Sequence, residues 1–325
     1  MKVVVVGFGS IGKRHFENLC SLLDGKVFIC TKKQQISKIS CSNVFSSLQD
    51  CIKEKPDIGF VTNITNLHIQ TALHLAKAGC HIFIEKPLSD SQAGIKSLID
   101  IVNKKQLVTL MGCNLRFHPC LVKVKDLVSS GKIGKIISVR AENGSYLPDW
   151  HPDEDYGKGY AARKDLGGGV VLTCIHEIDY LYWLFGDVEE VYSMSGKFSD
   201  LNIKSEDLSS IIFRFKNDII GELHLDYFQR PSSRNCTIIG SKGTIHWDFA
   251  TNTVKYYDIK TKKWLIVLRL KKYDFNSMYV AEAKHFLFCI KNKKKTINDI
   301  HQGFKILKIA MAILKSSKTH RPIRL

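Results

Sequence analysis

Short apolar runs alternate with amphipathic segments over the first third of the chain. Residues 2–6 contain four consecutive valines, which is typical of a strand buried on both faces of a parallel sheet. Apolar residues then recur at helical spacing over 11–23, and the alternation continues to residue 111. Further strands are expected at 27–30, 57–61, 81–84 and 107–111, and further helices at 68–77 and 91–103. Strand–helix units of this length predict a doubly wound α/β domain, a Rossmann fold with a parallel sheet.

The pattern changes after Pro119. A helix is expected at 121–129, and longer segments with strand character follow it. Asn217 and Asp218 separate two of these segments and favour a tight hairpin, because both residue types tolerate a positive φ. Strands are expected at 136–146, 189–198, 208–216, 219–227, 234–239, 243–249, 253–259 and 264–270, and helices at 276–291 and 300–315. The second part is predicted to be an α+β domain with a large, mostly antiparallel open sheet, and the domain bounds are predicted as 1–118 and 119–325.

A glycine-rich loop stands directly after the first predicted strand and opens the first predicted helix. It matches the pattern G-x-G-x-x-G, in which the first glycine permits a tight turn and the second lets backbone approach a pyrophosphate. The third glycine allows the strand to pack closely against the helix, whose amino terminus faces the phosphate charge. The alternative is a purely structural glycine turn. The residues expected to bind a dinucleotide are Gly7, Phe8, Gly9, Ser10, Ile11 and Gly12.

The end of the second predicted strand bears on the choice of cofactor. A carboxylate at this position binds the ribose hydroxyls of NAD, whereas cations accommodate the 2′-phosphate of NADP. This chain has Thr31, Lys32 and Lys33 there. The cofactor is therefore expected to be NAD or NADP, with a lean towards NADP. Alternatively, the lysines are simply exposed to solvent.

Three further motifs follow the glycine loop along the chain. They are Glu85-Lys86-Pro87, Asn114-Leu115-Arg116-Phe117, and Gly167-Gly168-Gly169 followed by His176-Glu177-Ile178-Asp179. In this order, spread from residue 7 to residue 179, the motifs resemble the glucose–fructose oxidoreductase, inositol dehydrogenase and rhizopine-catabolism family, abbreviated Gfo/Idh/MocA. The resemblance implies NAD(P)-dependent hydride transfer to or from a secondary hydroxyl of a sugar-like substrate. It also implies a homodimer or homotetramer that assembles through the open sheet of the second domain.

The resemblance assigns roles to individual residues of this chain. Lys86 matches the family's lysine beside the nicotinamide and would donate a hydrogen bond to the substrate oxygen. His176 resembles the catalytic histidine that takes the proton from the hydroxyl, and Asp179 would be its partner or a simple helix-face carboxylate. Many relatives have an aspartate shortly before this histidine, but neither Leu172 nor Thr173 is acidic. Further cofactor contacts are expected from Thr62, Asn63, His68 and Glu85.

A polar and aromatic segment precedes the glycine triplet and suggests how a substrate would be held. Aromatic faces pack against sugar rings, and Arg or Lys side chains bind phosphate or carboxylate groups. By analogy with relatives in surface-polysaccharide biosynthesis, a nucleotide-linked amino sugar is the preferred substrate. The expected substrate contacts, besides Lys86 and His176, are Asn114, Arg116, Trp150, Tyr160, Arg163 and Thr173.

Composition narrows the remaining choices. Lys and Arg (48) outnumber Asp and Glu (31), which gives a formal charge of +17 and favours anionic ligands. The lysines come without a helix-turn-helix, zinc-finger or RNP-like pattern, so no specific nucleic acid partner is expected. The ten cysteines match neither a zinc site nor a disulfide framework, which favours reduced thiols, no metal and a cytoplasmic location. The apolar start is too short for a signal peptide or a membrane span.

Three other functions stay open at this point. A noncatalytic regulator could bind cofactor and sugar with the same fold, which the missing aspartate favours. An enzyme that keeps NAD bound could use transient oxidation for epimerisation, exchange or glycoside cleavage. Nucleic-acid binding through the basic surface is the third, and it would depend steeply on salt.

Overall fold

The computed structural model describes residues 1–32 and 44–325, so Lys33 lies outside the described residues. The chain folds into two compact units. Unit 1 comprises Met1–Asn114 and Asn276–Leu307, and unit 2 comprises Leu115–Phe275 and Lys308–Leu325. The segment 276–307 therefore belongs to unit 1, although the order of strands and helices along the sequence places it with the second part of the chain.

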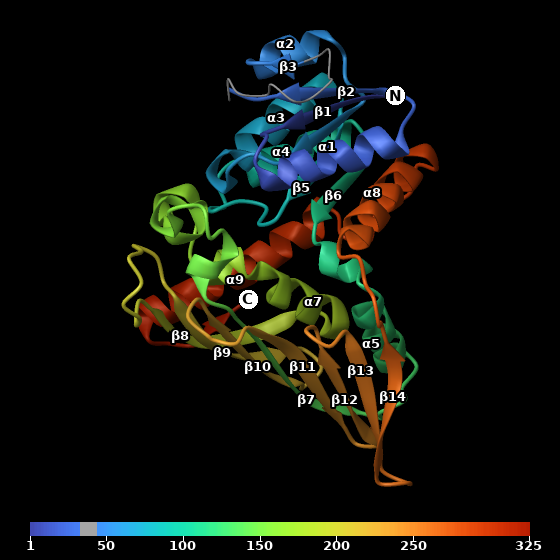
Figure 1. Ribbon diagram of the computed structural model, residues 1–325, viewed down its shortest axis with the longest axis vertical. Helices are drawn as coiled ribbons and strands as arrows, with labels where there is room; N and C mark the ends of the chain where they lie inside the picture. Colours follow the sequence, from blue (N-terminus) through green and yellow to red (C-terminus); the bar gives the residue numbers. More distant parts are fainter. Residues whose placement is uncertain (33–43) are drawn as a thin grey trace. The chain divides into compact units, whose positions relative to one another are not determined.

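Unit 1 is built on a parallel six-stranded sheet with the strand order β3-β2-β1-β4-β5-β6 (Figure 1). This is the strand order of a dinucleotide-binding Rossmann fold, which confirms the predicted fold class. The strands are β1 (Lys2–Val6), β2 (Lys26–Cys30), β3 (Val44–Phe45), β4 (Ile58–Val61), β5 (His81–Glu85) and β6 (Thr109–Gly112). The helices are α1 (Ser10–Leu22), α2 (Leu48–Lys53), α3 (His68–Ala78), α4 (Ile95–Lys104) and α8 (Asn276–Lys291).

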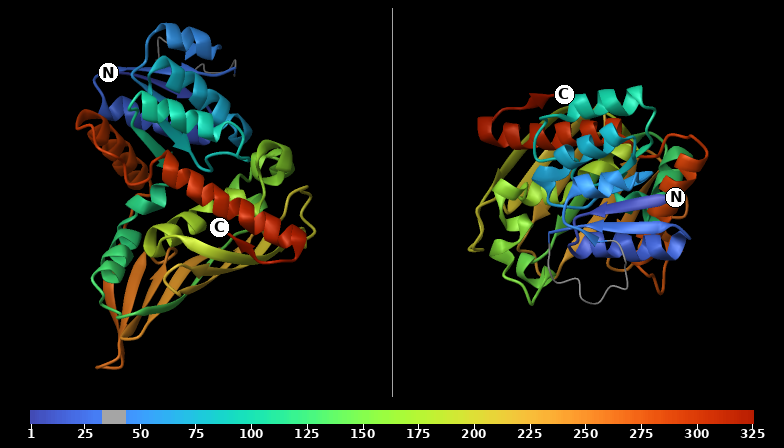
Figure 2. Two further views of the ribbon diagram at one scale, coloured as in Figure 1. Left: turned by 180° about the vertical axis from the view of Figure 1, so that it is seen from behind. Right: turned by 90° about the horizontal axis from the view of Figure 1, so that it is seen from above.

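The core of unit 1 explains why the segment 276–307 returns to it. Helices α1 and α8 lie on one face of the sheet, and α3 and α4 lie on the other (Figures 1 and 2). Phe60 and Phe83 stack on neighbouring strands with ring centroids 4.5 Å apart, and Phe286 of α8 contacts both rings edge-on. All three side chains are fully buried together with Val3 and Val5 of β1. Because burial of one phenylalanine contributes about 1.5–3 kcal/mol, this contact alone favours the return of α8.

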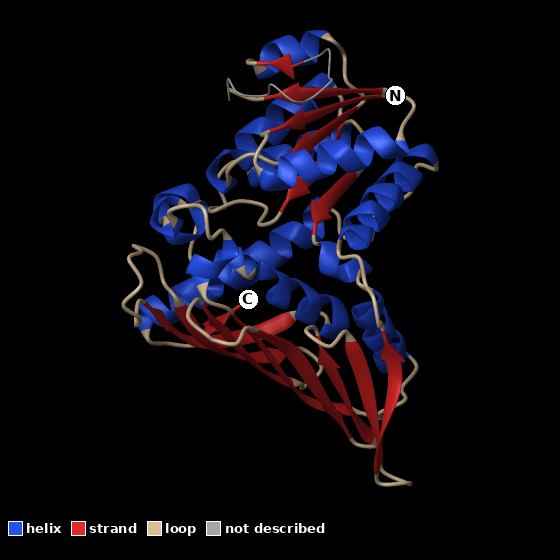
Figure 3. Cartoon of the chain, in the orientation of Figure 1, coloured by secondary structure: helices blue, strands red, loops and turns tan. Residues whose placement is uncertain are grey.

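Unit 2 contains a large sheet, whose strands are red in Figure 3. Its nine strands have the order β14-β13-β12-β11-β7-β10-β9-β8-β15. Every neighbouring pair is antiparallel except β7 with β10, which confirms the predicted mostly antiparallel sheet. The strands are β7 (Ile136–Gly144), β8 (Val188–Gly196), β9 (Leu208–Phe215), β10 (Ile220–Asp226), β11 (Ser233–Gly240), β12 (Gly243–Asp248), β13 (Thr253–Asp258), β14 (Lys263–Arg269) and β15 (Ile323–Arg324). Asp218 has a φ of 61° in the predicted hairpin between β9 and β10.

Helices cover one face of this sheet, with α5 over β12, β13 and β14 and α7 over β7 (Figure 1). The helices are α5 (Pro119–Ser129), α6 (Val170–Thr173), α7 (Ile175–Phe185) and α9 (Ile300–Thr319), the last of which begins in unit 1. Short 3-10 turns are η1 (Thr65–Leu67), η2 (Asn114–Phe117), η3 (Leu147–Trp150), η4 (Tyr156–Lys158), η5 (Tyr160–Ala162) and η6 (Lys164–Leu166). Within 1–32 and 44–325, no helix has the length and apolar character needed to cross a bilayer.

A buried histidine caps the start of α5. His118 Nδ1 accepts a hydrogen bond from the backbone N–H of Cys120 (3.2 Å), and Nε2 lies 3.2 Å from Asn252 Oδ1. The ring is fully buried among aromatic side chains. Burial lowers the pKa of His118 to about 4; the hydrogen bond with Asn252 opposes this shift, and the charge of Arg234 adds to it.

The depressed pKa of His118 predicts a loss of stability on acidification. The unfolded chain binds a proton at this ring below about pH 6.5, whereas the folded chain does so only below about pH 4. The free energy of unfolding should therefore fall by about 2 kcal/mol between about pH 7 and about pH 5. His118→Asn keeps an acceptor for the Cys120 N–H and removes the titration, so urea unfolding of this variant should depend less on pH. The same pH dependence in both proteins would contradict the assignment.

Candidate functional site

The glycine loop between β1 and α1 excludes side chains at two of its positions. Gly7 has a φ of +97°, and a Cβ atom there would lie 2.5 Å from the backbone of Asn63. A Cβ atom at Gly12 would collide with the carbonyl oxygen of Gly7. Gly9 differs, because a Cβ atom there would have no heavy atom of the described chain within 4 Å. Gly7 and Gly12 are thus required by the fold, whereas Gly9 leaves space at the mouth of the loop.

The amino terminus of α1 suits a phosphate group. Gly9 caps this 13-residue helix without a side-chain hydrogen bond, and the first turn carries no acidic residue. The first backbone N–H groups therefore lack a capping side chain and contribute to the positive end of the helix dipole. Ser10 is exposed and Ile11 half-buried beside them, while Phe8 packs edge-on against Phe16. These residues fit the pyrophosphate of a dinucleotide.

Two predicted cofactor residues follow β4. Thr62 Oγ1 donates hydrogen bonds to the carbonyl oxygens of Gly7 (2.8 Å) and Val6 (3.1 Å), so its hydroxyl holds the glycine loop in place. Asn63 donates its amide group to Thr71 Oγ1 (2.9 Å). The Oδ1 atom of Asn63 is buried and has no hydrogen-bond partner among the residues described. Because buried polar atoms are normally paired, this oxygen is a candidate acceptor for a ligand hydroxyl.

The predicted ribose position lies at the end of β2. The backbone N–H of Thr31 donates to the carbonyl oxygen of Phe45 (2.9 Å), which ties β2 to β3. Lys32 is exposed to solvent. Since Lys33 lies outside the described residues, Lys32 is the cation that the structure places at this position.

Lys86 follows β5 at the same carboxyl edge of the sheet as the glycine loop, and Pro87 follows it through a cis peptide bond. The preceding Glu85 is 6% exposed, and its Oε1 lies 2.7 Å from His15 Nε2 on α1. Its Oε2 accepts a hydrogen bond from the backbone N–H of Lys86 (3.1 Å). The carboxylate predicted to contact cofactor is thus placed to support the turn. His15 was not predicted as a site residue, and its only signal in the sequence is its place on the apolar, buried face of α1.

His68 joins two loops at this edge. Its Nδ1 lies 2.8 Å from the carbonyl oxygen of Pro87, and its Nε2 lies 2.9 Å from the carbonyl oxygen of Asn63. The side chain is 1% exposed, and burial lowers its pKa while the two carbonyl groups raise it in part. Each ring nitrogen lies within hydrogen-bond distance of a backbone carbonyl oxygen, so His68 connects the two loops, and its predicted cofactor contact stays a prediction.

In unit 2 the glycine triplet turns the chain into the helices that carry His176. Gly167 and Gly169 have φ values of +85° and +109°, which favour glycine. A Cβ atom at Gly168 would collide with the carbonyl oxygen of Tyr160. The chain then enters α6 and α7, and His176 lies half-buried in the first turn of α7.

The charged residues that follow this histidine, Glu177 and Asp179, form ion pairs with arginines. Arg116 donates from Nε (2.9 Å) and Nη2 (2.8 Å) to the carboxylate of Asp179, and both side chains are fully buried. Glu177 lies 2.8 Å from the Nε atom of Arg234. Because removing one member of a buried pair costs about 3–5 kcal/mol, these pairs hold α7 in the unit. The ion pair with Asp179 gives Arg116 a structural role, and the predicted substrate contact of Arg116 and the pairing of Asp179 with His176 stay predictions.

Two predicted substrate residues are buried. Asn114 is 4% exposed at the end of the first segment of unit 1, and its Oδ1 lacks a hydrogen-bond partner in the described part of the chain. Thr173 is also 4% exposed, at the last position of α6. Either side chain contacts a ligand only if the ligand reaches below the surface of its unit.

The polar and aromatic segment before the triplet is more open. Tyr160 is 37% exposed. Arg163 forms an exposed ion pair with Asp165, which competes with any substrate charge. Trp150 donates from Nε1 to Ser145 Oγ (2.8 Å), so its indole orientation is fixed.

A carboxyl group that the sequence analysis missed lies against the glycine triplet. A Cβ atom at Gly169 would collide with the carboxylate of Glu206, whose Oε1 accepts a hydrogen bond from the Val171 N–H (3.4 Å). Burial raises the pKa of Glu206. The sequence gives no signal for Glu206, because this residue lies 35 positions beyond Val171 and outside the interval between the glycine triplet and His176.

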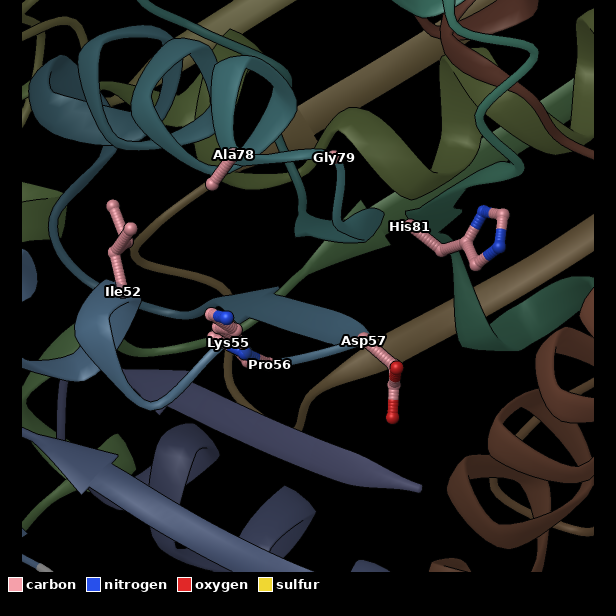
Figure 4. Close-up of a pocket in the computed structure, with 7 residues that line it drawn as sticks. All are labelled: Ile52, Lys55, Pro56, Asp57, Ala78, Gly79 and His81. Carbon is pink, nitrogen blue, oxygen red and sulfur yellow. The ribbon is translucent and has the colours of Figure 1, made fainter.

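A pocket of about 400 Å³ lies at the opposite edge of the sheet in unit 1 (Figure 4). It is lined by residues at the amino-terminal ends of β4 and β5, including Asp57 just before β4 and His81, the first residue of β5. Asp57 Oδ2 accepts the backbone N–H of Lys2 (2.7 Å), and His81 Nδ1 accepts that of Val108 (2.9 Å). Because the glycine loop and the lysine turn follow the carboxyl ends of their strands, this pocket is separate from the candidate site.

Comparison with known proteins agrees with this arrangement. The sequence profile of the oxidoreductase family with an NAD-binding Rossmann fold, GFO/IDH/MocA, matches residues 1–113, and the profile of the GFO/IDH/MocA C-terminal domain matches residues 121–246. The chain belongs to the Gfo/Idh/MocA family. Membership accounts for the order of the two units and identifies the glycine loop as part of an NAD-binding domain.

Individual Gfo/Idh/MocA proteins match over nearly their whole length. Myo-inositol 2-dehydrogenase of Thermotoga maritima is 26% identical over 100% of this chain and 98% of its own. Levoglucosan dehydrogenase, solved with NADH and levoglucosan, has a TM-score of 0.90 at 18% identity and covers 100% of this chain and 99% of its own. The WlbA dehydrogenase from Bordetella pertussis, solved with NADH and UDP-GlcNAcA, has a TM-score of 0.85 at 22% identity, covering 100% and 97%. The structures of levoglucosan dehydrogenase and the WlbA dehydrogenase share the fold of this chain.

Substitutions at Gly9 and Gly12 should separate the two roles of the glycine loop. The Cβ atom that Gly12→Ala adds collides with Gly7, so we expect the melting temperature to fall by about 3–10 °C. The Cβ atom that Gly9→Ala adds enters open space, so the melting temperature should stay within about 2 °C while NADH affinity falls about ten-fold or more. Thermal unfolding and calorimetry measure both. Wild-type NADH affinity in a folded Gly9→Ala protein would refute the role given to Gly9.

Proposed function

We propose that this protein catalyses hydride transfer between a nicotinamide dinucleotide and a secondary hydroxyl or ketone of a sugar or nucleotide sugar. The observation that carries the proposal is a hydrogen-bonded edge in unit 1. Thr62 joins the loop after β4 to Gly7, and His68 joins the same loop to the turn that carries Lys86. The dinucleotide loop and the family's characteristic lysine therefore belong to one continuous edge, where α/β sheets bind their ligands.

The steps assigned to this chain are hydrogen-bonding and proton-transfer steps. When bound, the nicotinamide supplies the hydride acceptor or donor. Lys86 would donate a hydrogen bond to the substrate oxygen and stabilise the negative charge that develops there during oxidation. His176 would take the proton of the hydroxyl, because an imidazole accepts and returns protons near neutral pH.

The missing aspartate affects the roles proposed for Lys86 and His176. Leu172 and Thr173 stand where many relatives carry an aspartate, so His176 would transfer the proton without a carboxylate at that position. Glu206 is a carboxyl group in the same unit, but its contacts are with Gly169 and Val171. Turnover by this protein, which lacks the aspartate, would distinguish it from a noncatalytic regulator with the same fold.

The proposed substrate is a nucleotide-linked sugar. The formal charge of +17 favours anionic ligands, and the WlbA dehydrogenase was solved with a UDP-sugar. Among the predicted contacts we retain Asn114, whose buried Oδ1 lacks a partner within the described chain, and Tyr160, which is exposed. Trp150, Arg163 and Thr173 remain predictions of the same kind.

The proposed cofactor preference is NADP over NAD. It rests on the residues after β2, where Thr31 and the exposed Lys32 stand in place of a carboxylate. The relatives with bound cofactor were solved with NADH, and those complexes support a nicotinamide dinucleotide without distinguishing the two forms for this chain.

We also propose a homodimer or homotetramer in the cytoplasm. Along β8, β9 and β10 the side chains of Met194, Ile212 and Ile220 alternate with buried neighbours and are 60%, 52% and 37% exposed. Apolar side chains on adjacent strands form the kind of surface that a second copy covers. The proposed cytoplasmic location rests on the cysteine spacing, which does not match a disulfide framework.

Purified protein should reduce NAD⁺ or NADP⁺ with at least one member of a panel of myo-inositol, levoglucosan and UDP-GlcNAcA, measured by the absorbance of the reduced nicotinamide. Lys86→Met and His176→Asn should each lower kcat/KM by about 10²–10⁴-fold, because each removes one hydrogen-bonding or proton-transfer group. Lys77→Ala, on the exposed end of α3, is the matched lysine control and should keep full activity. Dinucleotide binding without turnover of any panel member would favour the regulator, and no dinucleotide binding would overturn the proposal.

Lys32→Ala tests the cofactor preference. If Lys32 contacts the 2′-phosphate, its removal should weaken NADP⁺ binding about five-fold and leave NAD⁺ binding unchanged, since one exposed ion pair contributes about 1 kcal/mol. Calorimetry with both dinucleotides measures the ratio, with Lys77→Ala as control. A wild-type protein that prefers NAD⁺, with no change on substitution, would show that the preference is wrong.

A further inference from the structure

The backbone amide of Lys86 is held by a chain of buried polar groups. It donates to Glu85 Oε2 (3.1 Å), and Glu85 Oε1 lies 2.7 Å from His15 Nε2. His15 is fully buried and belongs to α1, the helix that opens at the glycine loop. A hydrogen bond to a buried carboxylate is stronger than one between neutral groups. The series of hydrogen bonds from His15 through Glu85 therefore fixes the Lys86 amide firmly.

The surroundings leave the Glu85 carboxylate little freedom to move. A Cβ atom at Gly112 would lie 2.9 Å from its Cδ atom, so the carboxylate rests directly against the backbone of β6. The His15 ring packs against Phe83, with centroids 4.8 Å apart, and against Tyr279 at 5.9 Å. The Nδ1 atom of His15 has no hydrogen-bond partner in the described residues, so the ring's polar contact is the one with Glu85.

A second histidine holds the other side of the same turn. The carbonyl oxygen of Pro87 lies 2.8 Å from His68 Nδ1, and His68 Nε2 reaches the carbonyl oxygen of Asn63 at 2.9 Å. The turn is therefore held at two points: Glu85 and His15 hold the backbone amide of Lys86, and His68 holds the carbonyl group of the following Pro87. They connect the turn to different neighbours, α1 on one side and the loop after β4 on the other.

We propose that His15 and His68 are positioning residues that fix the backbone of Lys86 from its two sides, His15 through Glu85 and His68 through Pro87. The inference rests on the proposed function for its catalytic consequence, because it assumes that Lys86 acts on the substrate oxygen. Neither histidine is assigned a contact with substrate or cofactor. Displacing a catalytic group by about 1 Å lowers a rate by about 10²-fold, so anchors of this kind control turnover without touching the reacting atoms.

The first test measures the Lys86 amide itself and needs no substrate. Hydrogen–deuterium exchange of the peptide that contains Lys86 should become about ten-fold faster or more in Glu85→Ala and His15→Leu, because the amide loses a fixed acceptor. His15→Gln places an N–H donor near the position of Nε2 and should restore protection to within about three-fold. If His15→Leu fails to fold, the comparison of Glu85→Ala with His15→Gln decides.

His81 provides a matched control at the opposite end of the same strand. Its Nδ1 accepts the Val108 N–H (2.9 Å), so His81→Leu removes a partly buried histidine hydrogen bond from unit 1 without touching the lysine turn. A general loss of stability accelerates exchange throughout the unit, whereas loss of an anchor accelerates it at the turn. Unchanged exchange at Lys86 in both Glu85→Ala and His15→Leu, or equal acceleration in His81→Leu, would overturn the inference.

The second test follows turnover with the panel substrate that the wild type oxidises. His15→Leu and His68→Leu should lower kcat about 10–100-fold while the KM for the dinucleotide changes less than about three-fold, and His15→Gln should recover most of kcat. His81→Leu should keep wild-type kcat. A wild-type kcat in both leucine variants would overturn the positioning roles.

The two tests also separate failure of the inference from failure of the proposed function. Full activity in Lys86→Met would show that the function proposed for Lys86 is wrong, while the exchange result would still stand for the anchors. An inactive Lys86→Met protein with unaffected His15 and His68 variants would leave the proposed function intact and remove the positioning roles alone.

Discussion

Backbone atoms approach one another so closely at the carboxyl edge of the parallel sheet that no side chain fits between them. Gly12 lies against the carbonyl group of Gly7, and Gly7 lies against the backbone of Asn63. These contacts set the start of α1 relative to β1 and β4. The loop after β4 and the turn that carries Lys86 lie at the same edge. The hydroxyl of Thr62 bonds the same carbonyl group, so the loop after β4 is fixed to the glycine loop before any ligand binds. The preorganisation of the edge thus combines close backbone contacts at the glycines with a side-chain hydrogen bond from Thr62.

Local patterns were sufficient to predict most elements and insufficient to predict their partners. The apolar spacing over 276–291 gives α8 its observed bounds, because periodicity reports which face of a helix is apolar. It does not report what covers that face, and Phe286 packs in unit 1 next to Phe60 and Phe83. The two-residue strand β3 was missed for a different reason, since two residues are too few to show any alternation.

The predicted site residues divide in the same way. The glycine loop was predicted from the spacing of Gly7, Gly9 and Gly12, which is typical of a tight turn between a strand and a helix. The structure has such a turn between β1 and α1. Arg116 and His68 were selected for their chemistry, but the structure uses the first against Asp179 and the second between two carbonyl groups. A sequence shows which side chains are capable of binding a ligand. It does not show which of them the fold has already engaged, because that depends on residues such as Asp179 that lie 63 positions away.

The chain passes from one unit to the other three times, after Asn114, after Phe275 and after Leu307. A gene fragment that ended near residue 118 would encode all six strands of the parallel sheet, yet its product would leave Phe60 and Phe83 without the cover of α8. A single recombination point cannot transplant the dinucleotide-binding half intact. The two regions that encode residues 1–114 and 276–307 are therefore expected to be inherited together, because they are two pieces of one folding unit.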